Sequence, residues 1–333
     1  MKFRKIFAAL TAAAMLATGV GCANNGTSSG AADGKTYKIG ISKMMTHDAM
    51  DKAEQGFVAA LDEKGYTDKV EIDYQNGQGE TANLNTIATQ FVGNNVDLIF
   101  AIATPAAQAA QAQTQEIPII GTAITDFADA GLVNSNEEPG TNVSGTTDMN
   151  PIKEQIDLMM KICPDTKVVG FLYNSSEDNS LLQIGIAKEY VESLGLSWTE
   201  KTVSNTNEVQ QATTAIVEEC DAIYIPTDNI FASAMATVGE VAIQAKKAVF
   251  TGETGMCYAG GLATLGLDYY NLGYEAGLMA IQVLEGADIS KMAVKGASDF
   301  NYVINKDMVD ALGIAIPEDL QQYISAPPAA DAE

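Results

Sequence analysis

The sequence predicts an α/β protein made of two Rossmann-like lobes, each with a parallel sheet, joined by a hinge. Short apolar runs typical of buried strands alternate with helical patterns along the chain. The same strand and helix order occurs twice, and the region of about 300 residues that carries it is long enough for two hydrophobic cores. Alternating strands and helices favour parallel sheets that are covered by helices on both faces.

The clearest strand–helix–strand unit spans residues 95–127. An apolar strand at 98–102 leads to Thr104 and Pro105, residue types that cap a helix and occupy its first turn. An alanine-rich helix follows, and a second strand begins at Ile119. Ligands of parallel sheets bind beyond the carboxyl ends of the strands, beside the helix N-termini. We therefore expect a binding edge at this end of the strands.

The second half of the chain repeats the order of elements in the first half. In the first half, the expected strands are 37–41, 70–74, 98–102 and 118–121, and the helices between them are 49–64 and 80–92. In the second half, strands are expected at 167–173, 197–203, 221–223 and 248–252, with helices ending at 194 and spanning 207–219. Two copies of one module predict two similar lobes.

The remaining elements do not follow the repeat. They are a strand at 261–267, a helix at 269–285, a strand at 300–305 and a helix at 308–312. We expect them to cross back between the lobes, so that several strands form a hinge and the lobes close on a ligand. The predicted first lobe is 37–147 plus 266–296, and the second is 148–265 plus 297–325.

The N-terminal segment has the pattern of a secretory signal. Lys2, Arg4 and Lys5 precede an apolar stretch at 6–16, and small residues lead to Cys22. We predict a lipoprotein signal peptide at 1–21, lipidation of Cys22 and a flexible tether at 22–36, which is rich in Gly, Ser, Asn and Ala. The protein is then exported and anchored by lipid to the outer face of the cell membrane. The alternative is an ordinary signal peptide with an incidental cysteine.

Charge and cysteine content exclude several classes of partner. The formal net charge is −24 at pH 7, and the predicted signal peptide contains no acidic residue, so its removal makes the chain more negative. Such a surface repels nucleic acid, and no nucleic-acid partner is expected. Cys163, Cys220 and Cys257 fit no zinc spacing, and an odd number of thiols cannot pair completely within one chain.

Sequence motifs of the common enzyme classes are missing. The chain has one histidine, His47, and contains no G-x-S-x-G, H-E-x-x-H or G-x-x-x-x-G-K-[ST] motif. Gly77-Gln78-Gly79 lacks the third glycine of a dinucleotide fingerprint. We therefore expect a binding protein without catalytic residues, cofactor or metal.

Polar residues recur directly after the apolar strands. Hydroxyls and helix N-termini there suit a carboxylate, whereas Asp126, Asp228 or Glu253 suits a protonated amine, so the set predicts an amino-acid zwitterion. Any single one is equally consistent with a helix cap. The candidates for an apolar or aromatic subsite are Met44, Met45, Phe127, Tyr173 and Phe231. The full set of candidate ligand-binding residues is Met45, Thr46, Thr104, Pro105, Asp126, Phe127, Tyr173, Ser175, Ser176, Asn179, Ser180, Asp228, Asn229 and Glu253.

Almost end to end, the chain resembles the ABC-transporter substrate-binding proteins of the tryptophan/tyrosine type. The segments that carry the resemblance are Ile39-Gly40-Ile41, 47–51, 103–108, Thr125-Asp126, 139–145, Tyr173-Asn174 with Asn179-Ser180, and 266–269. The resemblance implies the type 1 periplasmic binding protein fold with three hinge crossings. It also implies capture of a small solute, often an aromatic amino acid, for an ABC permease and its ATPase, by a monomer. Phe127 departs from the family, which usually has proline there.

Two alternatives remain open from the sequence. The ligand of such a protein is in some cases a sugar or a nucleoside, but the one tryptophan, Trp198, lies on a strand away from the binding edge. The other alternative is a surface enzyme that uses an acidic pair such as Asp126 with Asp228.

Overall fold

The computed structural model describes residues 35–297 and 299–327. The predicted signal peptide, the lipidation site Cys22 and the tether up to residue 34 lie outside the described residues. Residues 36–333 form one unit by their internal contacts. None of the helices in the described part of the chain has the length and apolar character needed to cross a membrane.

The first sheet has six strands in the order β11-β5-β4-β3-β1-β2, and all its pairings are parallel. Its central strand β3 is buried along its whole length, as expected for a parallel sheet covered on both faces. The strands are β1 (Tyr37–Lys43), β2 (Val70–Asn76), β3 (Leu98–Ile102), β4 (Ile119–Ile124), β5 (Val143–Thr147) and β11 (Lys295–Gly296).

The second sheet has seven strands in the order β13-β12-β10-β9-β8-β6-β7. Only the β10–β12 pair is antiparallel. The strands are β6 (Val168–Asn174), β7 (Ser197–Val203), β8 (Ala222–Ile225), β9 (Ala248–Thr251), β10 (Ala263–Gly266), β12 (Asn301–Asn305) and β13 (Ile324–Ser325). Two mainly parallel sheets with interleaved helices confirm the predicted α/β fold class.

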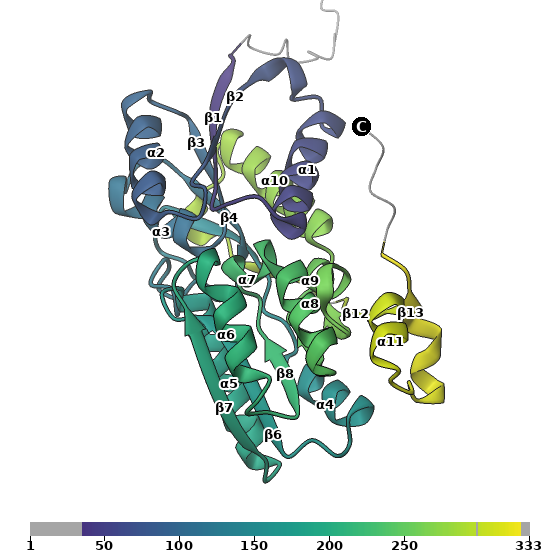
Figure 1. The fold of residues 1–333 in the computed structure, drawn as a ribbon. Helices are drawn as coiled ribbons and strands as arrows, with labels where there is room; N and C mark the ends of the chain where they lie inside the picture. The colour runs from purple at the N-terminus through teal and green to yellow at the C-terminus, as the bar shows by residue number, and fades with distance from the viewer. Residues whose placement is uncertain (1–34, 298, 328–333) are drawn as a thin grey trace, which may run out of the picture. The chain divides into compact units, whose positions relative to one another are not determined.

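The helices follow the strands in alternation, as the sequence predicts, and Figure 1 shows them around the two sheets. The α-helices are α1 (Asp48–Glu63), α2 (Thr81–Gly93), α3 (Thr104–Gln113), α4 (Ile152–Ile162), α5 (Asp178–Ser193), α6 (Val209–Ile216), α7 (Asn229–Ser233), α8 (Met235–Ala245), α9 (Thr254–Gly260), α10 (Tyr269–Leu284) and α11 (Lys306–Leu312). Short 3-10 turns occur at Thr67–Lys69, Thr206–Glu208, Ile289–Lys291 and Glu318–Tyr323.

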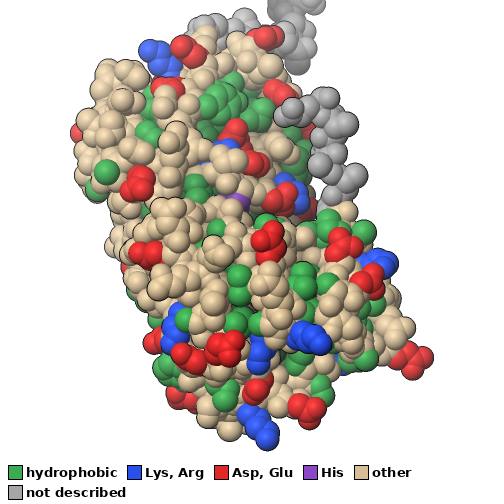
Figure 2. Space-filling model, viewed as in Figure 1, with side chains coloured by type: hydrophobic (Ala, Val, Ile, Leu, Met, Phe, Trp, Pro, Cys, Tyr) green, Lys and Arg blue, Asp and Glu red, His purple; other side chains and the backbone are tan. Residues whose placement is uncertain are grey.

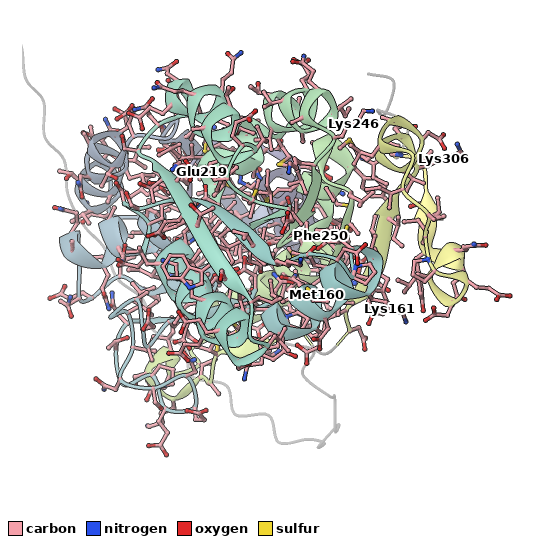
Figure 3. All side chains as sticks on the ribbon, turned by 60° about the horizontal axis from the view of Figure 1, so that its bottom comes forward. Met160, Lys161, Glu219, Lys246, Phe250 and Lys306 are labelled. Atoms are coloured by element: carbon pink, nitrogen blue, oxygen red, sulfur yellow. The ribbon has the colours of Figure 1, made fainter. Side chains whose placement is uncertain are left out.

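The chain passes between the two sheets three times. It leaves the first sheet after β5, returns through α10 to β11, and then enters the second sheet again at β12. One apolar cluster contains residues of both sheets, such as Phe100 and Val249, and a second cluster, with Phe171 and Tyr224, belongs to the second sheet. In the second sheet Phe250 of β9 is buried, whereas Lys246 and Lys306 lie at the outer surface (Figure 3). Charged side chains of both signs are interspersed over the face shown in Figure 2.

Helices α1 and α10 cross with their backbones in contact, and Figure 1 shows them side by side. Small residues make this approach possible. A Cβ atom on Gly273 would lie 1.9 Å from the Ala53 carbonyl oxygen, and one on Gly56 would lie 2.0 Å from the Tyr270 carbonyl oxygen. The contact joins segments more than 200 residues apart in the sequence.

Candidate ligand-binding site

A pocket of about 470 Å³ lies at the loops that follow the strands of both sheets. This volume falls in the range of small-molecule sites. Glu80 and Glu177 are the acidic side chains in its lining, which contains no lysine or arginine. Its lining comprises Met44, Gly79, Glu80, Thr81, Ala82, Asn85, Pro105, Gln108, Ala109 and Ala112 on one side, with Asn174, Ser176, Glu177 and Ser204 on the other.

Unpaired polar atoms gather after the strands of both sheets. In the described part of the chain, five buried side-chain atoms lack a hydrogen-bond partner, and four of them follow β1, β3, β5 and β6. Native structures leave few such atoms, so a group of them needs an explanation. These four are His47 Nδ1, Thr104 Oγ1, Asn150 Oδ1 and Asn179 Oδ1. All can accept hydrogen bonds, which suits a ligand with N–H or O–H donors.

A hydrogen-bonded chain joins His47 to Glu177. Asn229 Nδ2 donates to Glu177 Oε2 at 2.6 Å, so the Asn229 Oδ1 atom is left to accept from His47 Nε2 at 3.4 Å. A neutral imidazole that donates from Nε2 has a bare lone pair on Nδ1. The unpaired His47 Nδ1 atom therefore follows from the orientation that Glu177 imposes on Asn229.

A second network connects the pocket region to the crossings between the sheets. Asp148 accepts from Tyr269 at 2.7 Å and from Thr125 at 3.1 Å. Gln183 in turn donates to Thr125 Oγ1 at 3.3 Å and to the Thr227 carbonyl at 3.2 Å. Burial raises the pKa of Asp148. Residues from segments that follow strands of both sheets thus share one buried polar network.

Asn150 and Asn179 flank Thr227. Asn150 Nδ2 donates to Thr227 Oγ1 at 3.1 Å, and Asn179 Nδ2 donates to the Thr227 carbonyl at 3.1 Å. These bonds fix the orientation of both amides, whose oxygens have no hydrogen-bond partner among the described residues. Two unpaired acceptors are therefore held at one short segment after β8.

All three predicted acidic residues use their oxygens to accept from backbone N–H groups. Asp228 accepts from the N–H groups of Asn174 and Phe231 and from Ser180 Oγ, at 2.6, 2.9 and 2.7 Å. Glu253 caps α9 through the N–H groups at 255 and 256. Asp126 accepts from the N–H groups at 128 and 129 and from the Asn136 amide.

Of the residues predicted for the apolar subsite, Met44 lines the pocket, whereas the aromatic ones do not. Phe127 is fully buried and packs against Gly121 in the core of the first sheet. Burial, together with the hydrogen bond that the Tyr173 hydroxyl donates to Glu200 at 2.8 Å, raises the pKa of Tyr173 to about 12. Neither side chain lines the 470 Å³ pocket.

The other predicted residues divide between the pocket region and its surroundings. Pro105 and Ser176 line the pocket, and Asn179 and Asn229 belong to the network around Glu177. Met45 is buried in the first core, and Ser180 is held by Asp228. The remaining two, Thr46 and Ser175, are exposed.

The prediction that Thr104 caps its helix is wrong. Ala103 holds the N-cap position without a side-chain hydrogen bond, and Thr104 is the first residue of α3. Ala103 has a φ of 89°, in a region that non-glycine residues seldom adopt. Strained residues of this kind cluster at ligand sites. Helix α3 therefore begins without a side-chain cap, beside the unpaired Thr104 hydroxyl.

Sequence reasoning left out several residues of this region, namely His47, Asp148, Asn150, Glu177, Gln183 and Tyr269. Glu177 carried a usable signal, because it lies between two predicted residues in the loop after β6. Asp148 and Asn150 follow β5, a strand that was not predicted because its sequence Val143–Thr147 is short and contains a glycine. In the described part of the chain no group of three or more His, Cys, Asp or Glu is arranged to hold a metal ion.

The buried carboxylates predict a pH dependence of stability in the ligand-free protein. Burial raises the pKa of Glu253 to about 7, and burial with the nearby Asp228 charge raises the pKa of Glu177 to about 8. Both carboxyl groups have an ordinary pKa of 4.5 in the unfolded chain. Between pH 4.5 and these raised pKa values the folded state therefore binds more protons than the unfolded state, so its stability falls as the pH rises. Burial lowers the pKa of His47, so this residue makes the folded state more stable as the pH rises. That effect is complete near pH 6.5, the ordinary pKa of histidine.

We therefore expect the thermal unfolding midpoint to fall as the pH rises from about 6.5 to about 8. Scanning calorimetry of the refolded, ligand-free protein measures this. The variant Glu253→Gln, which removes one of the two titrating groups, is expected to have a shallower slope. A midpoint that stays level or rises over this range in the wild-type protein would contradict the prediction.

The fold and the site define a ligand-binding protein, in which unpaired acceptors and a pocket lie between segments of two parallel sheets. Comparison with known families agrees. The model of the family described as ABC transporter substrate binding protein matches residues 38–326. The chain therefore belongs to this family of substrate-binding proteins, which is not a class of enzymes and whose members in importers work outside the cytoplasm.

Individual relatives match over nearly the whole chain. A tyrosine-binding protein from Clostridioides difficile (strain R20291) is 41% identical over 300 residues, which is 88% of this chain and 87% of the relative. An ABC domain from Streptococcus pneumoniae, solved in complex with L-Trp, has a TM-score of 0.85 at 38% identity, covering 87% of this chain and 100% of that chain.

A second solved relative is a ligand-free, open structure. The ligand-free, open structure of a substrate binding protein with adhesive properties from Clostridium difficile has a TM-score of 0.67 at 39% identity, covering 88% of this chain and 99% of that chain. Identity to the two solved relatives is nearly equal, yet the L-Trp complex is the closer match in structure.

Proposed function

We propose that this protein captures an aromatic amino acid, tyrosine or tryptophan in the first place, for an ABC importer. The observation that carries the proposal is the set of buried, unpaired acceptors beside a pocket of suitable size. The relatives named for tyrosine and for L-Trp support the choice of ligand class. The protein acts as a monomer, is lipid-anchored at Cys22 on the outer face of the membrane, and delivers its ligand to a permease with its ATPase.

The ligand carboxylate is held in this proposal without an arginine. Arg4 is the only arginine of the sequence and lies in the predicted signal peptide. Helices α2 and α3 both begin at the pocket, where Thr81 and Pro105 are lining residues. The positive ends of these two helices, with the Thr104 and Ser176 hydroxyls, supply neutral donors for an anion.

Binding is coupled to closure of the two lobes, residues 37–147 with 266–296 and residues 148–265 with 297–325. Gln108 of α3 donates to Asp178 of α5 at 2.8 Å, and His47 contacts Asn229, so bonds already join the two sets of residues. The closer similarity to the L-Trp complex than to the open relative supports a closed arrangement. A ligand shifts this equilibrium only by its differential affinity for the closed form.

A thermal-unfolding screen of the refolded protein tests the proposal. A ligand at a thousand times its dissociation constant stabilises the folded state by about 4 kcal/mol. At roughly 2–4 °C per kcal/mol, we expect tyrosine or tryptophan to raise the midpoint by roughly 8–16 °C. Sugars, nucleosides and acidic amino acids serve as negative controls and are expected to leave the midpoint unchanged. A shift with a sugar or nucleoside alone would overturn the amino-acid assignment.

A further inference from the structure

Four buried acidic residues lie after strands of the second sheet or at its crossings, and they differ in what their oxygens contact. Asp148, Asp228 and Glu253 each accept from backbone N–H groups or hydroxyls close by. Glu177 holds the N-cap position of α5, yet its carboxylate makes no capping hydrogen bond to that helix. A carboxylate at this position commonly accepts from the first turn of its helix. Its side chain is directed elsewhere.

The Glu177 carboxylate is held by three neutral amides. The Nδ2 atoms of Asn174, Asn179 and Asn229 donate to it at 3.1, 3.4 and 2.6 Å. The side chain is 2% exposed and has no salt bridge in the described part of the chain. Amide dipoles orient a buried charge but do not neutralise it, so such a group favours a cation beside it.

Glu177 is also the buried acidic residue that lines the 470 Å³ pocket. Asn179, which donates to it, carries an unpaired Oδ1 atom on a side chain that is 8% exposed. The His47 ring contacts Asn229 through Nε2 but does not line the pocket. An alkylammonium group has three N–H donors and one positive charge, which matches this set of acceptors.

We infer that Glu177 is the ammonium-binding residue of the site, with the amides of Asn174, Asn179 and Asn229 holding its carboxylate in place. The inference rests on the proposed function and assigns one end of its zwitterionic ligand. The α2 and α3 N-termini line the same pocket and suit the other end. Asp228 then acts as a positioning residue, because it holds the backbone N–H of Asn174 and the hydroxyl of Ser180.

Ligand pairs that differ only in the ammonium group test the inference by calorimetry or competition. The pair is L-tyrosine and 3-(4-hydroxyphenyl)propanoate. Glu177→Gln is expected to weaken L-tyrosine binding roughly 10- to 100-fold, the range for a hydrogen bond to a charged group. The same variant is expected to change binding of the deaminated acid by less than about twofold. Equal losses for both ligands, or unchanged L-tyrosine affinity, would overturn the assignment.

Glu189→Gln is the matched control, because Glu189 is an exposed acidic residue of α5, the helix whose N-cap is Glu177, and lies outside the pocket lining. It is expected to alter neither affinity by more than about twofold, since an exposed charge contributes little. A loss of L-tyrosine affinity in Glu189→Gln as large as that in Glu177→Gln would also overturn the assignment to Glu177. If wild-type protein binds no amino acid at all, the proposed function itself fails. Wild-type binding that is insensitive to Glu177→Gln rejects only this inference.

A measurement on the wild-type protein keeps the test independent of the variant's folding. Glu177 faces the Asp228 carboxylate and, through Asn229, the His47 ring. The raised pKa of Glu177, about 8, means that it is partly protonated at pH 7 without ligand. Pairing with an ammonium group ionises it, so L-tyrosine binding is expected to release protons to the buffer. Calorimetry in buffers of different ionisation enthalpy detects this, and the absence of release would overturn the inference.

Discussion

Gly273→Ala is expected to destabilise the folded protein by about 3 kcal/mol or more. The new Cβ atom would lie 1.9 Å from the carbonyl oxygen of Ala53, which is backbone and cannot rotate away. Helices α1 and α10 would have to separate, and their buried small residues would lose contact along the crossing. At roughly 2–4 °C per kcal/mol, the unfolding midpoint is expected to fall by roughly 6–12 °C. Denaturant unfolding followed by circular dichroism measures the change.

Gly185→Ala is the matched control for this variant. Gly185 also lies inside a helix, α5, but a Cβ atom there would meet nothing within 4 Å. Alanine in an open helical position is expected to stabilise by roughly 0.5–1 kcal/mol, because glycine loses more backbone entropy on folding. The same substitution should therefore have opposite signs at the two positions. Equal effects at both would contradict the close crossing of α1 and α10.

Asp228→Ala is expected to cost about 3 kcal/mol or more in unfolding free energy. The substitution leaves two buried backbone N–H groups and the Ser180 hydroxyl without an acceptor, and each such loss costs roughly 1–3 kcal/mol. The removal of a buried charge beside Glu177 offsets part of this. Because Asp228 contributes to the raised pKa of Glu177, that pKa is expected to fall in the variant.

Asp268→Ala provides the comparison for Asp228→Ala. Asp268 also caps a helix, α10, where its side chain accepts from the N–H groups of residues 270 and 271, but it is exposed. Water replaces a lost acceptor there, so the expected cost is about 1 kcal/mol. Urea titrations of the two variants at one pH give the difference. A cost for Asp228→Ala that is no larger than that for Asp268→Ala would contradict the structural role of Asp228.

Apolar runs and runs rich in strand-forming residues made several strands predictable. The runs at 98–102 and 197–203 have the bounds of β3, which is buried along its whole length, and of β7, an edge strand that is mostly half-buried. Other elements escaped prediction. Helix α4 has apolar residues at a helical spacing and was overlooked, while β5 carries Gly145 and three hydroxyl-bearing residues that look like a loop. Burial of β5 comes from its neighbours in the sheet, which a local pattern does not contain.

The position of the binding edge was also predictable from the sequence, but the role of each acidic residue there was not. In the sequence, each of four acidic residues follows a strand and precedes a helix or turn, so the four look alike: Asp126, Glu177, Asp228 and Glu253. Only the structure separates carboxylates that accept from local backbone N–H groups from one that faces neighbouring amides. Those contacts depend on side-chain rotamers and on partners up to 54 residues away, so residue type and spacing do not determine them.

The threefold passage between the sheets governs the order in which the chain is able to fold. Helix α1 lacks its cover until α10 has been synthesised, and the edge strands β11 and β13, with β12 beside β13, come from the last 40 residues. Neither sheet is therefore finished before nearly the whole chain is present, and contacts between distant segments make such folding slow. Both sheets are therefore completed only at the end of synthesis, so a truncated or stalled chain exposes apolar surface in both.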